Sequence, residues 1–449
     1  MSRSGHRAQS AGLRKQGAGH RKGSDDSANG VGFAGIAVIL LFVMFAARGA
    51  WAYSFLTHEA IIDLTWDAAI RPLLLERFPG TTEAQLREAH AYAYGGSAIQ
   101  DAGYYPFGHT FFSELTHYVR TGDFISNMIH DARNVNELAF ALGALSHYVG
   151  DTVGHSEATN PSTAIVFPNL EKQYGPEVTY EESPHAHIRT EFAFDIDELS
   201  SRRFAPASYL RHVGLRVSRR VLEEAFYQTY GLRLHDVLGN EFASFRSYRS
   251  SVENLLPRFA YAEVLLYRKR FPQDEPSPAF TEFTQRLKTA DAENGWETFR
   301  KNKVSFRTRL LAVLIFLTPK FGPMSCLAIR GPNEQTEEKY IDSVNHSMDV
   351  YTKLLGGLGQ KGQDGFQLAN LDLDTGNKIR PGGYRLTDET YAKLLATITR
   401  DDVRVHVPAE LRRNVREFYS NPDAPIETRK HPRQWKKVMR ELATIEAPR

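Results

Sequence analysis

One stretch of the chain places three polar side chains at helical spacing within an otherwise apolar segment. Residues 145–155 read Leu-Ser-His-Tyr-Val-Gly-Asp-Thr-Val-Gly-His, so that His147, Asp151 and His155 follow one another at intervals of four residues. On an α-helix, residues four apart lie on one face, about 6 Å further along the axis. The two histidines are then about 12 Å apart, too far to share one ion with bonds of about 2 Å. Because Asp151 between them has two oxygens, the spacing predicts a cluster of metal sites.

The distribution of histidine supports this interpretation. Nine of the sixteen histidines fall between His58 and His187, and a second pair at helical spacing, His187 and Glu191, follows the first segment. A single histidine or a single His–Asp pair is usually structural, but the two segments together favour metal binding. The lone cysteine, Cys326, excludes a disulfide within the chain and a cysteine zinc site. His, Asp and Glu must therefore supply the ligands.

The N-terminal region has the pattern of an export signal. A basic, Gly/Ser-rich stretch precedes the apolar run 31–47, and Ala50-Trp51-Ala52 has the small residues of a cleavage site. We expect residues 1–52 to be a signal peptide, whose removal leaves Tyr53 as the new N-terminus. The alternative is an uncleaved anchor, because the run 31–47 is close to the length that spans a bilayer. Both alternatives place residues 53–449 outside the cytoplasm, as an exported (periplasmic or secreted) or membrane-anchored protein.

From residue 53 onward the apolar spacing is mostly helical. Thr57 is expected to cap a helix that ends near Pro72, and Asn134, with Glu137 three residues on, is expected to cap the central helix. Residues 101–115 are aromatic and glycine-rich without a helical period, which predicts a loop. Strand signals are rare, so the fold class is expected to be all-α. Further helices are expected at 82–94, 185–199, 206–230, 241–269, 278–290, 334–356 and 387–399.

The proline-rich, charged stretch 271–278 is the best candidate for a linker. It predicts a domain at 53–270 and a mostly helical C-terminal region at 271–449, which carries no motif that indicates a role. A second loop-rich stretch runs from 357 to 383. The apolar run 310–317 is too short to span a bilayer. It is expected to be a buried helix, with contact to a membrane as the alternative.

The ordered set of motifs resembles the zinc-dependent phospholipase C family, whose fold is shared with the S1/P1-type nucleases. The resemblance covers about residues 53–200 and extends at most to about 270. It implies an all-α, multi-helix domain that binds two to three Zn²⁺ ions, with the N-terminal amine as one ligand. The ligand residues that it implies are Tyr53, His58, Asp101, His117, His147, Asp151, His155, His187 and Glu191.

The spacing between Asp151 and His155 is shorter than the family's common form and resembles the branch that contains glycosylphosphatidylinositol-specific phospholipase D. Because His155 then projects from the same helix as His147, one alternative is that it misses the second metal. The family's catalytic residues correspond to Asp101, which orients or deprotonates the attacking water, and to Asp151. The expected reaction is in-line attack of a metal-bound hydroxide on phosphorus.

Three classes of function follow from this reading. A phospholipase C-like hydrolase leads, acting on a phospholipid or another phosphodiester, with contact to a membrane surface and no protein partner predicted. The alternatives are a nuclease or other phosphodiesterase on the same scaffold, and a metal-stabilised protein without turnover. The formal net charge of +2 neither requires nor excludes nucleic acid. The aromatic residues that are expected to supply either base stacking or a lipid-facing rim are Tyr104, Tyr105, Phe107, Phe111 and Phe112.

Overall fold

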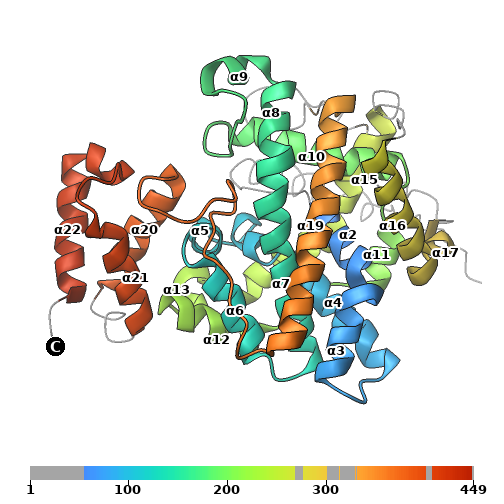
Figure 1. Ribbon diagram of the computed structural model, residues 1–449, viewed down its shortest axis with the longest axis horizontal. Coiled ribbons are helices and arrows are strands. Elements are labelled where there is room, and N and C mark those ends of the chain that lie inside the picture. Colours follow the sequence, from blue (N-terminus) through green and yellow to red (C-terminus); the bar gives the residue numbers. More distant parts are fainter. Residues whose placement is uncertain are drawn as a thin grey trace, which may run out of the picture. The chain divides into compact units, whose positions relative to one another are not determined.

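The fold class predicted from the sequence is confirmed: the described part of the chain is built from helices and contains no strand (Figure 1). The computed structural model describes residues 55–267, 277–300, 331–400 and 407–446, together with residues 313 and 329. An isolated pair between Leu371 and Lys378 is the β-type contact within these residues. The layers of the described part are therefore formed by packed helices.

The helices of the N-terminal half follow one another with short connections. They are α2 (Phe55–Thr65), η1 (Trp66–Ile70), α3 (Arg71–Arg77), α4 (Glu83–Gly96), η2 (Gln100–Tyr104), α5 (Thr110–Tyr118), α6 (Thr121–Asp131), α7 (Val135–Gly154), η3 (His155–Thr159), α8 (Asn160–Val166), α9 (Pro168–Tyr174), α10 (Pro184–Ser200), α11 (Ala207–Val213), α12 (Arg219–Tyr230), α13 (Leu234–Leu238), α14 (Glu241–Ser250), η4 (Ser251–Leu255) and α15 (Leu256–Tyr267).

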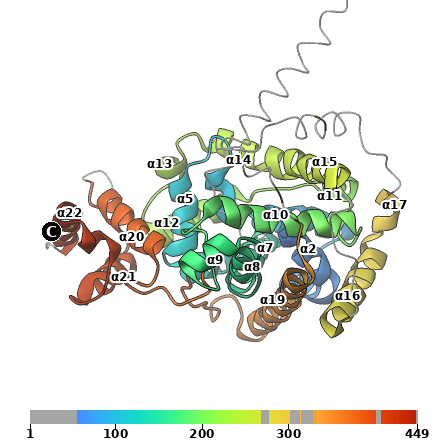
Figure 2. The same cartoon turned by 90° about the horizontal axis from the view of Figure 1, so that it is seen from above.

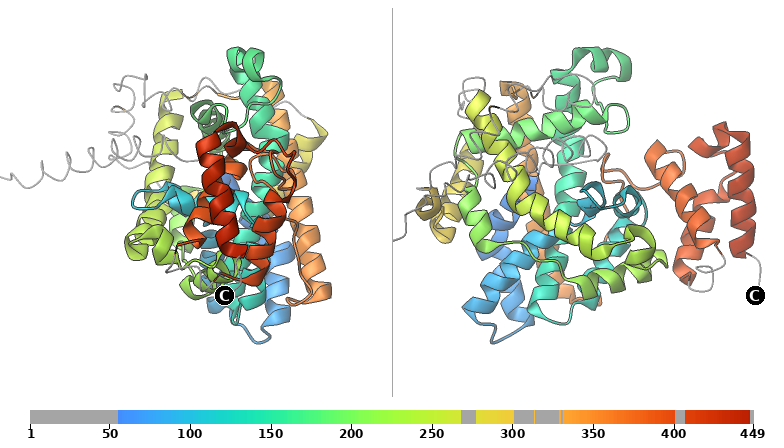
Figure 3. Two further views of the ribbon diagram at one scale, coloured as in Figure 1. Left: turned by 90° about the vertical axis from the view of Figure 1, so that its left-hand side faces the viewer. Right: turned by 180° about the vertical axis from the view of Figure 1, so that it is seen from behind.

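The remaining helices belong to the C-terminal region. They are α16 (Pro278–Asn294), α17 (Trp296–Arg300), α19 (Glu334–Lys361), α20 (Arg385–Ile398), α21 (Ala409–Ser420), η7 (Glu427–Lys430) and α22 (Pro432–Glu446). Aromatic side chains join the last of these helices to one another, since Tyr391 of α20 stacks on Phe418 of α21 and Tyr419 of α21 contacts Trp435 of α22. The three helices α20, α21 and α22 lie together in red in Figure 3.

Helix α7 is the centre of the core. Of its twenty residues all but Asn136 are buried, as expected for a helix that is apolar around its whole circumference. The long helix α19 lies beside it in Figure 1 and in Figure 2. The hydroxyl of Tyr351 on α19 donates to the carbonyl of Leu142 on α7. Any polar side chain on the middle of α7 is therefore removed from water.

Glycines set the spacing between α7 and α4. A Cβ atom on Gly143 would lie 2.1 Å from the carbonyl oxygen of Ala93, and a Cβ on Gly96 would lie 2.0 Å from that of Phe140. No real Cβ makes such contacts, so the two backbones approach more closely than any other residue allows. This crossing brings the end of α4, and with it the start of η2, against the middle of α7.

The predicted cap of the central helix is present in part. The side chain of Asn134 accepts hydrogen bonds from the backbone of Asn136 and Glu137, so Asn134 is the N-cap of α7. Glu137 does not close a box with Asn134. Its carboxylate accepts from the backbone N–H of Arg133 and pairs with Arg220 of α12, which joins the start of α7 to a neighbouring helix.

Two local predictions are wrong. Thr57 is not an N-cap, because α2 already begins at Phe55 and the hydroxyl of Thr57 donates to Asp195 of α10. The helical path also continues past Pro72, which occupies the first turn of α3, where its missing N–H has no partner to lose.

The predicted loop 101–115 is also mostly ordered. It contains the end of η2 and most of α5, because Phe112, Leu115 and Val119 bury one side of α5 and its connection against the core. The helix predicted at 206–230 divides at Gly214 into α11 and α12.

Several predictions fall on other parts of the chain. The signal peptide at 1–52, Tyr53, and most of the runs 271–278 and 310–317 lie outside the described residues. The boundary near residue 270 stays a prediction. Among the helices that the structure describes, none combines the length and the apolar character needed to cross a bilayer.

The crossing of α4 and α7 can be tested by adding one methyl group. Because its Cβ would meet a backbone oxygen, Gly143→Ala is expected to lower the free energy of unfolding by about 1–3 kcal/mol. Gly356→Ala on the exposed side of α19 meets no atom within 4 Å and is expected to raise stability by up to about 1 kcal/mol. Urea unfolding followed by circular dichroism measures both, and equal stability of the two variants would contradict the close approach.

Candidate metal centre

The helices converge on a set of buried histidines and carboxylates. Each is at most 4 % exposed. They come from six elements: His58 from α2, Asp101 from η2, His117 from α5, His147 and Asp151 from α7, His155 from η3, and His187 and Glu191 from α10. Every residue in the sequence prediction except Tyr53, which lies outside the described residues, is therefore in this set.

The carboxylate of Asp151 is shared by three imidazoles. Its Oδ1 lies 3.3 Å from Nε2 of His58, and its Oδ2 lies 3.1 Å from Nε2 of His147 and 3.4 Å from Nε2 of His117. Nε2 of His117 also lies 3.3 Å from Oδ1 of Asp101. The two oxygens of Asp151 therefore face different histidines, and the donor atoms form two overlapping groups.

A second cluster forms around Glu191. Its Oε1 lies 2.7 Å from Nε2 of His187, one turn earlier on α10, and 3.3 Å from Nε2 of His155. His155 thus leaves the ridge on which the sequence places it. Eight residues after His147 it has turned about 80° around the helix, which carries it away from Asp151 toward α10.

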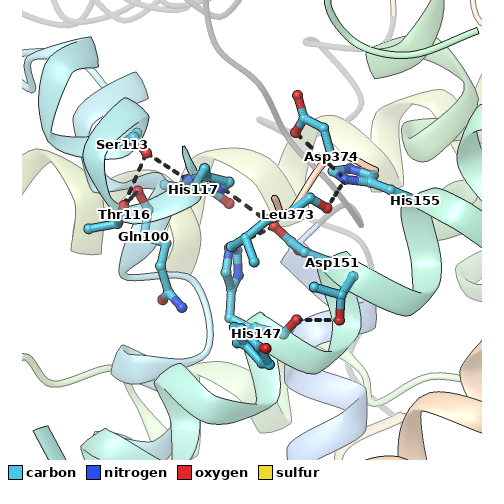
Figure 4. A network of polar contacts seen from close by, with 12 residues as sticks. Gln100, Ser113, Thr116, His117, His147, Asp151, His155, Leu373 and Asp374 are labelled. Carbon is cyan, nitrogen blue, oxygen red and sulfur yellow. Dashed lines mark hydrogen bonds and ion pairs between the residues drawn. The ribbon is translucent and has the colours of Figure 1, made fainter. Parts of the chain in front are cut away.

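Backbone carbonyls fix the orientation of three of these imidazoles, and Figure 4 shows the contacts of His117 and His155. Nδ1 of His147 lies 3.0 Å from the carbonyl oxygen of Ser97, Nδ1 of His117 lies 2.8 Å from that of Ser113, and Nδ1 of His155 lies 2.8 Å from that of Leu373. A carbonyl oxygen only accepts, so each Nδ1 carries the proton and donates. In the neutral imidazole Nε2 is then an acceptor with a free lone pair.

The arrangement brings acceptors next to acceptors. Nε2 lone pairs of His117, His147 and His155 face carboxylate oxygens at 3.1–3.4 Å. Nε2 of His147 and both oxygens of Asp151 have no hydrogen-bond partner among the described residues. Such contacts are repulsive unless a proton or a cation lies between the two atoms. Ligands of a tetrahedral zinc ion lie about 3.3 Å apart, close to the distances observed.

Burial and charge act differently on the two carboxylates. Burial alone would raise the pKa of Asp151, but His147, His117 and His58 together outweigh it and lower this pKa well below its usual value. Burial, together with repulsion from Asp151 and Asp101, raises the pKa of Glu191 well above its usual value. Burial and the neighbouring His155 also lower the pKa of His187 well below its usual value. The surroundings of Glu191 therefore favour its ionised form less than those of Asp151 do.

A comparison with known families gives one match. Residues 57–240 match the family model described as zinc dependent phospholipase C. These residues are a zinc-dependent phospholipase C family domain. The search of curated proteins gave no significant match, and neither did the search of solved structures.

The family is one of zinc-dependent hydrolases, and its description implies a phospholipid substrate. The buried groups of this phospholipase C domain are consistent with that description. Three sets of these residues have donor atoms close enough together to hold a metal ion. The sets are His58, His147 and Asp151; Asp101, His117 and His147; and His155, His187 and Glu191.

Residues from beyond the phospholipase C domain also contact its buried groups, and the motifs did not predict them. Leu373 and Asp374, between α19 and α20, contact His155, and Tyr118 and Tyr384 donate to Asp374. The signal in the sequence is limited to three acids, Asp364, Asp372 and Asp374, within the loop-rich stretch 357–383. Nothing in their spacing connects them with His155.

The aromatic residues of the segment 104–112 do not form a common rim. Tyr104, Tyr105, Phe111 and Phe112 are buried, whereas Phe107 is 75 % exposed. The ring of Tyr104 packs 5.9 Å from that of His117, so it lines the interior of the phospholipase C domain. The expectation of a continuous stacking or lipid-facing surface from these five residues is therefore wrong.

Two other histidines, His90 and His130, lie outside this set. His90 is buried, stacks on Trp66 and lies 2.9 Å from Oδ1 of Asp63, which also accepts from Tyr94. Burial raises the pKa of Asp63, and these two contacts oppose that rise. His130 is 57 % exposed and lies on α6.

His90→Ala is expected to destabilise the chain without changing its metal content. It leaves the buried Asp63 short of one partner, at a cost of about 1–3 kcal/mol in the free energy of unfolding. Thermal unfolding and elemental analysis measure the two effects. His130→Ala serves as the exposed control, with a change within about 0.5 kcal/mol. Loss of metal in the His90 variant would show that His90 also belongs to the metal centre.

Proposed function

We propose that this protein is an exported zinc-dependent phosphodiester hydrolase that cleaves phospholipids as a phospholipase C does. The observation that carries the proposal is the Asp151 carboxylate. It is fully buried on α7, its Oδ1 faces Nε2 of His58, and its Oδ2 faces Nε2 of His147, which is an acceptor. This is the arrangement that a carboxylate bridging two metal ions requires.

The proposed ligands divide among two to three Zn²⁺ ions. Asp101, His117 and His147, with one oxygen of Asp151, hold the first. The other oxygen of Asp151, together with His58 and the amine and carbonyl of Tyr53, holds the second. Tyr53 stands five residues before His58 in the sequence, and the proposal assigns both to the same ion. The third ion is assigned to His155, His187 and Glu191.

Zinc at these positions supplies Lewis acidity toward the phosphodiester oxygens and makes a bound water acidic near neutral pH. The chain's own residues orient the attacking water and exclude bulk water. Asp101 is the least buried member of the set and is assigned to orient the attacking water and to accept its proton. The apolar surroundings of α7 exclude bulk water, which strengthens every charge interaction at the centre.

Asp151→Asn is expected to remove bound metal and hydrolysis together. An amide offers one neutral oxygen where the carboxylate offers two charged ones, so it cannot serve two ions. The wild-type chain is expected to contain two to three zinc equivalents by elemental analysis, and the variant fewer. Phosphate-monoester release from phosphatidylcholine vesicles is expected to fall to background.

The exposed His130→Ala variant is the matched control for folding and activity. Single-stranded DNA is offered as a second substrate to the wild-type protein. Hydrolysis of DNA without hydrolysis of phosphatidylcholine would show that the protein is a nuclease and contradict the proposed phospholipase activity. Fewer than one zinc equivalent in the wild type, or full activity of the Asp151 variant, would contradict the proposal.

Export and the second ion depend on one cleavage event. Removal of residues 1–52 creates an amine five residues before His58. Because the pKa of such an amine is near 8, zinc can displace its proton near neutral pH. N-terminal sequencing of the exported protein is expected to begin at Tyr53, with Trp51 as the second choice. Several extra residues ahead of Tyr53 are expected to remove one zinc equivalent and most activity. An extended chain as active as the processed one would exclude the amine as a ligand.

A further inference from the structure

The segment between α19 and α20 crosses the proposed metal centre. We name residues 366–384 the strap; they lie well beyond the phospholipase C domain at 57–240. The hydroxyl of Tyr148 on α7 donates to the carbonyl of Ala369, and the backbone N–H of Leu368 donates to the hydroxyl of Ser126 on α6. The strap is therefore fastened to the helices that surround the centre.

Leu373 of the strap makes backbone hydrogen bonds to two of the proposed ligand residues. Its N–H donates to the carbonyl of His117 at 3.1 Å, and its carbonyl accepts from Nδ1 of His155 at 2.8 Å. The first bond holds the strap against the end of α5, where His117 lies. The second fixes the protonated nitrogen of His155, so that Nε2 faces Glu191 as an acceptor.

Asp374 presents a buried carboxylate to the same imidazole (Figure 4). Its Oδ2 accepts hydrogen bonds from the hydroxyls of Tyr118 at 2.8 Å and Tyr384 at 2.7 Å. Its Oδ1 has no hydrogen-bond partner among the described residues and lies 3.7 Å from Nδ1 of His155. The side chain is fully buried.

Two tyrosine hydroxyls alone do not require a charge at position 374. A neutral amide oxygen accepts from them as well, and burying a carboxylate costs several kcal/mol unless a positive partner repays it. The free oxygen faces Nδ1 of His155 at 3.7 Å. Because that N–H is donated to the carbonyl of Leu373, the carboxylate acts on the imidazole through its charge and not through a hydrogen bond. An imidazole whose opposite nitrogen binds a metal ion becomes a stronger donor, and a carboxylate behind it orients the ring and increases its basicity.

We propose that Asp374 is a positioning residue for the ion at His155, His187 and Glu191. It acts through His155, and with Leu373 it holds that imidazole in the form that binds metal. The proposal rests on the proposed function, because it needs an ion at this cluster. It gives the C-terminal region, to which the motifs assign no role, a part in the metal centre.

The test measures zinc affinity in the full-length processed chain. Asp374→Asn keeps the shape and removes the charge, and it is expected to weaken one of the bound ions by roughly 10-fold or more. The remaining ions keep their affinity. Competition with a chromophoric chelator measures each affinity, and Co²⁺ in place of zinc gives a visible absorption spectrum in which the signal of one ion changes. The control is Asp364→Asn, which removes a carboxylate that is 95 % exposed just before the strap.

A second variant covers the case in which Asp374→Asn does not fold. Tyr384→Phe leaves the charge in place but releases one hydroxyl from it, and it is expected to weaken the same ion by a smaller factor. A wild-type chain without zinc contradicts the proposed function and this inference with it. A wild-type chain with zinc, alongside Asp374 and Tyr384 variants of unchanged affinity and spectrum, contradicts the inference alone.

Discussion

The buried charge of Asp151 is the constraint on which the rest of the centre depends. A carboxylate in the middle of an apolar helix is costly unless positive or donating groups surround it. Three imidazoles face it with Nε2, two of them from α2 and α5 and one from α7 itself, and a proton or a cation between the atoms makes these contacts favourable. Helices α2 and α5 must therefore each lie at one place relative to α7. The same groups that make the carboxylate tolerable are metal ligands by chemistry. Stability of the core and readiness for a cation thus depend on the same contacts.

The second requirement is that the imidazoles present the right nitrogen. Three of them donate from Nδ1 to a backbone carbonyl, and each carbonyl belongs to a different segment of the chain. Ser113 is on the same helix as His117, Ser97 lies at the end of α4, and Leu373 lies on the strap. The orientation of the ligands is therefore set partly by local helix geometry and partly by helix packing, such as the glycine crossing of α4 and α7.

The difference between contacts set by local helix geometry and contacts set by packing explains which parts of the site the sequence predicts. Pairs four residues apart, such as His147 with Asp151 and His187 with Glu191, are local, and helical spacing alone joins them. The contact of His155 with Glu191 is less local. It depends on the rotation of about 80° that a helix accumulates over the eight residues from His147 to His155. The contact of Asp374 with His155 joins distant segments through a strap without a repeating pattern, so no spacing rule reaches it. Thr57 resembles a cap, but its hydroxyl serves Asp195, a residue that only tertiary packing brings near.

The reach of the strap has a consequence for the order in which the protein is made. His155 and its acceptor Leu373 are separated by 218 residues. At a synthesis rate of 5–20 residues per second, Leu373 leaves the ribosome roughly 10–45 s after His155. All of the proposed ligands exist before the group that orients one of them, and closing so long a loop adds its own entropic delay. The orientation of His155 is therefore fixed only after every ligand residue has been made.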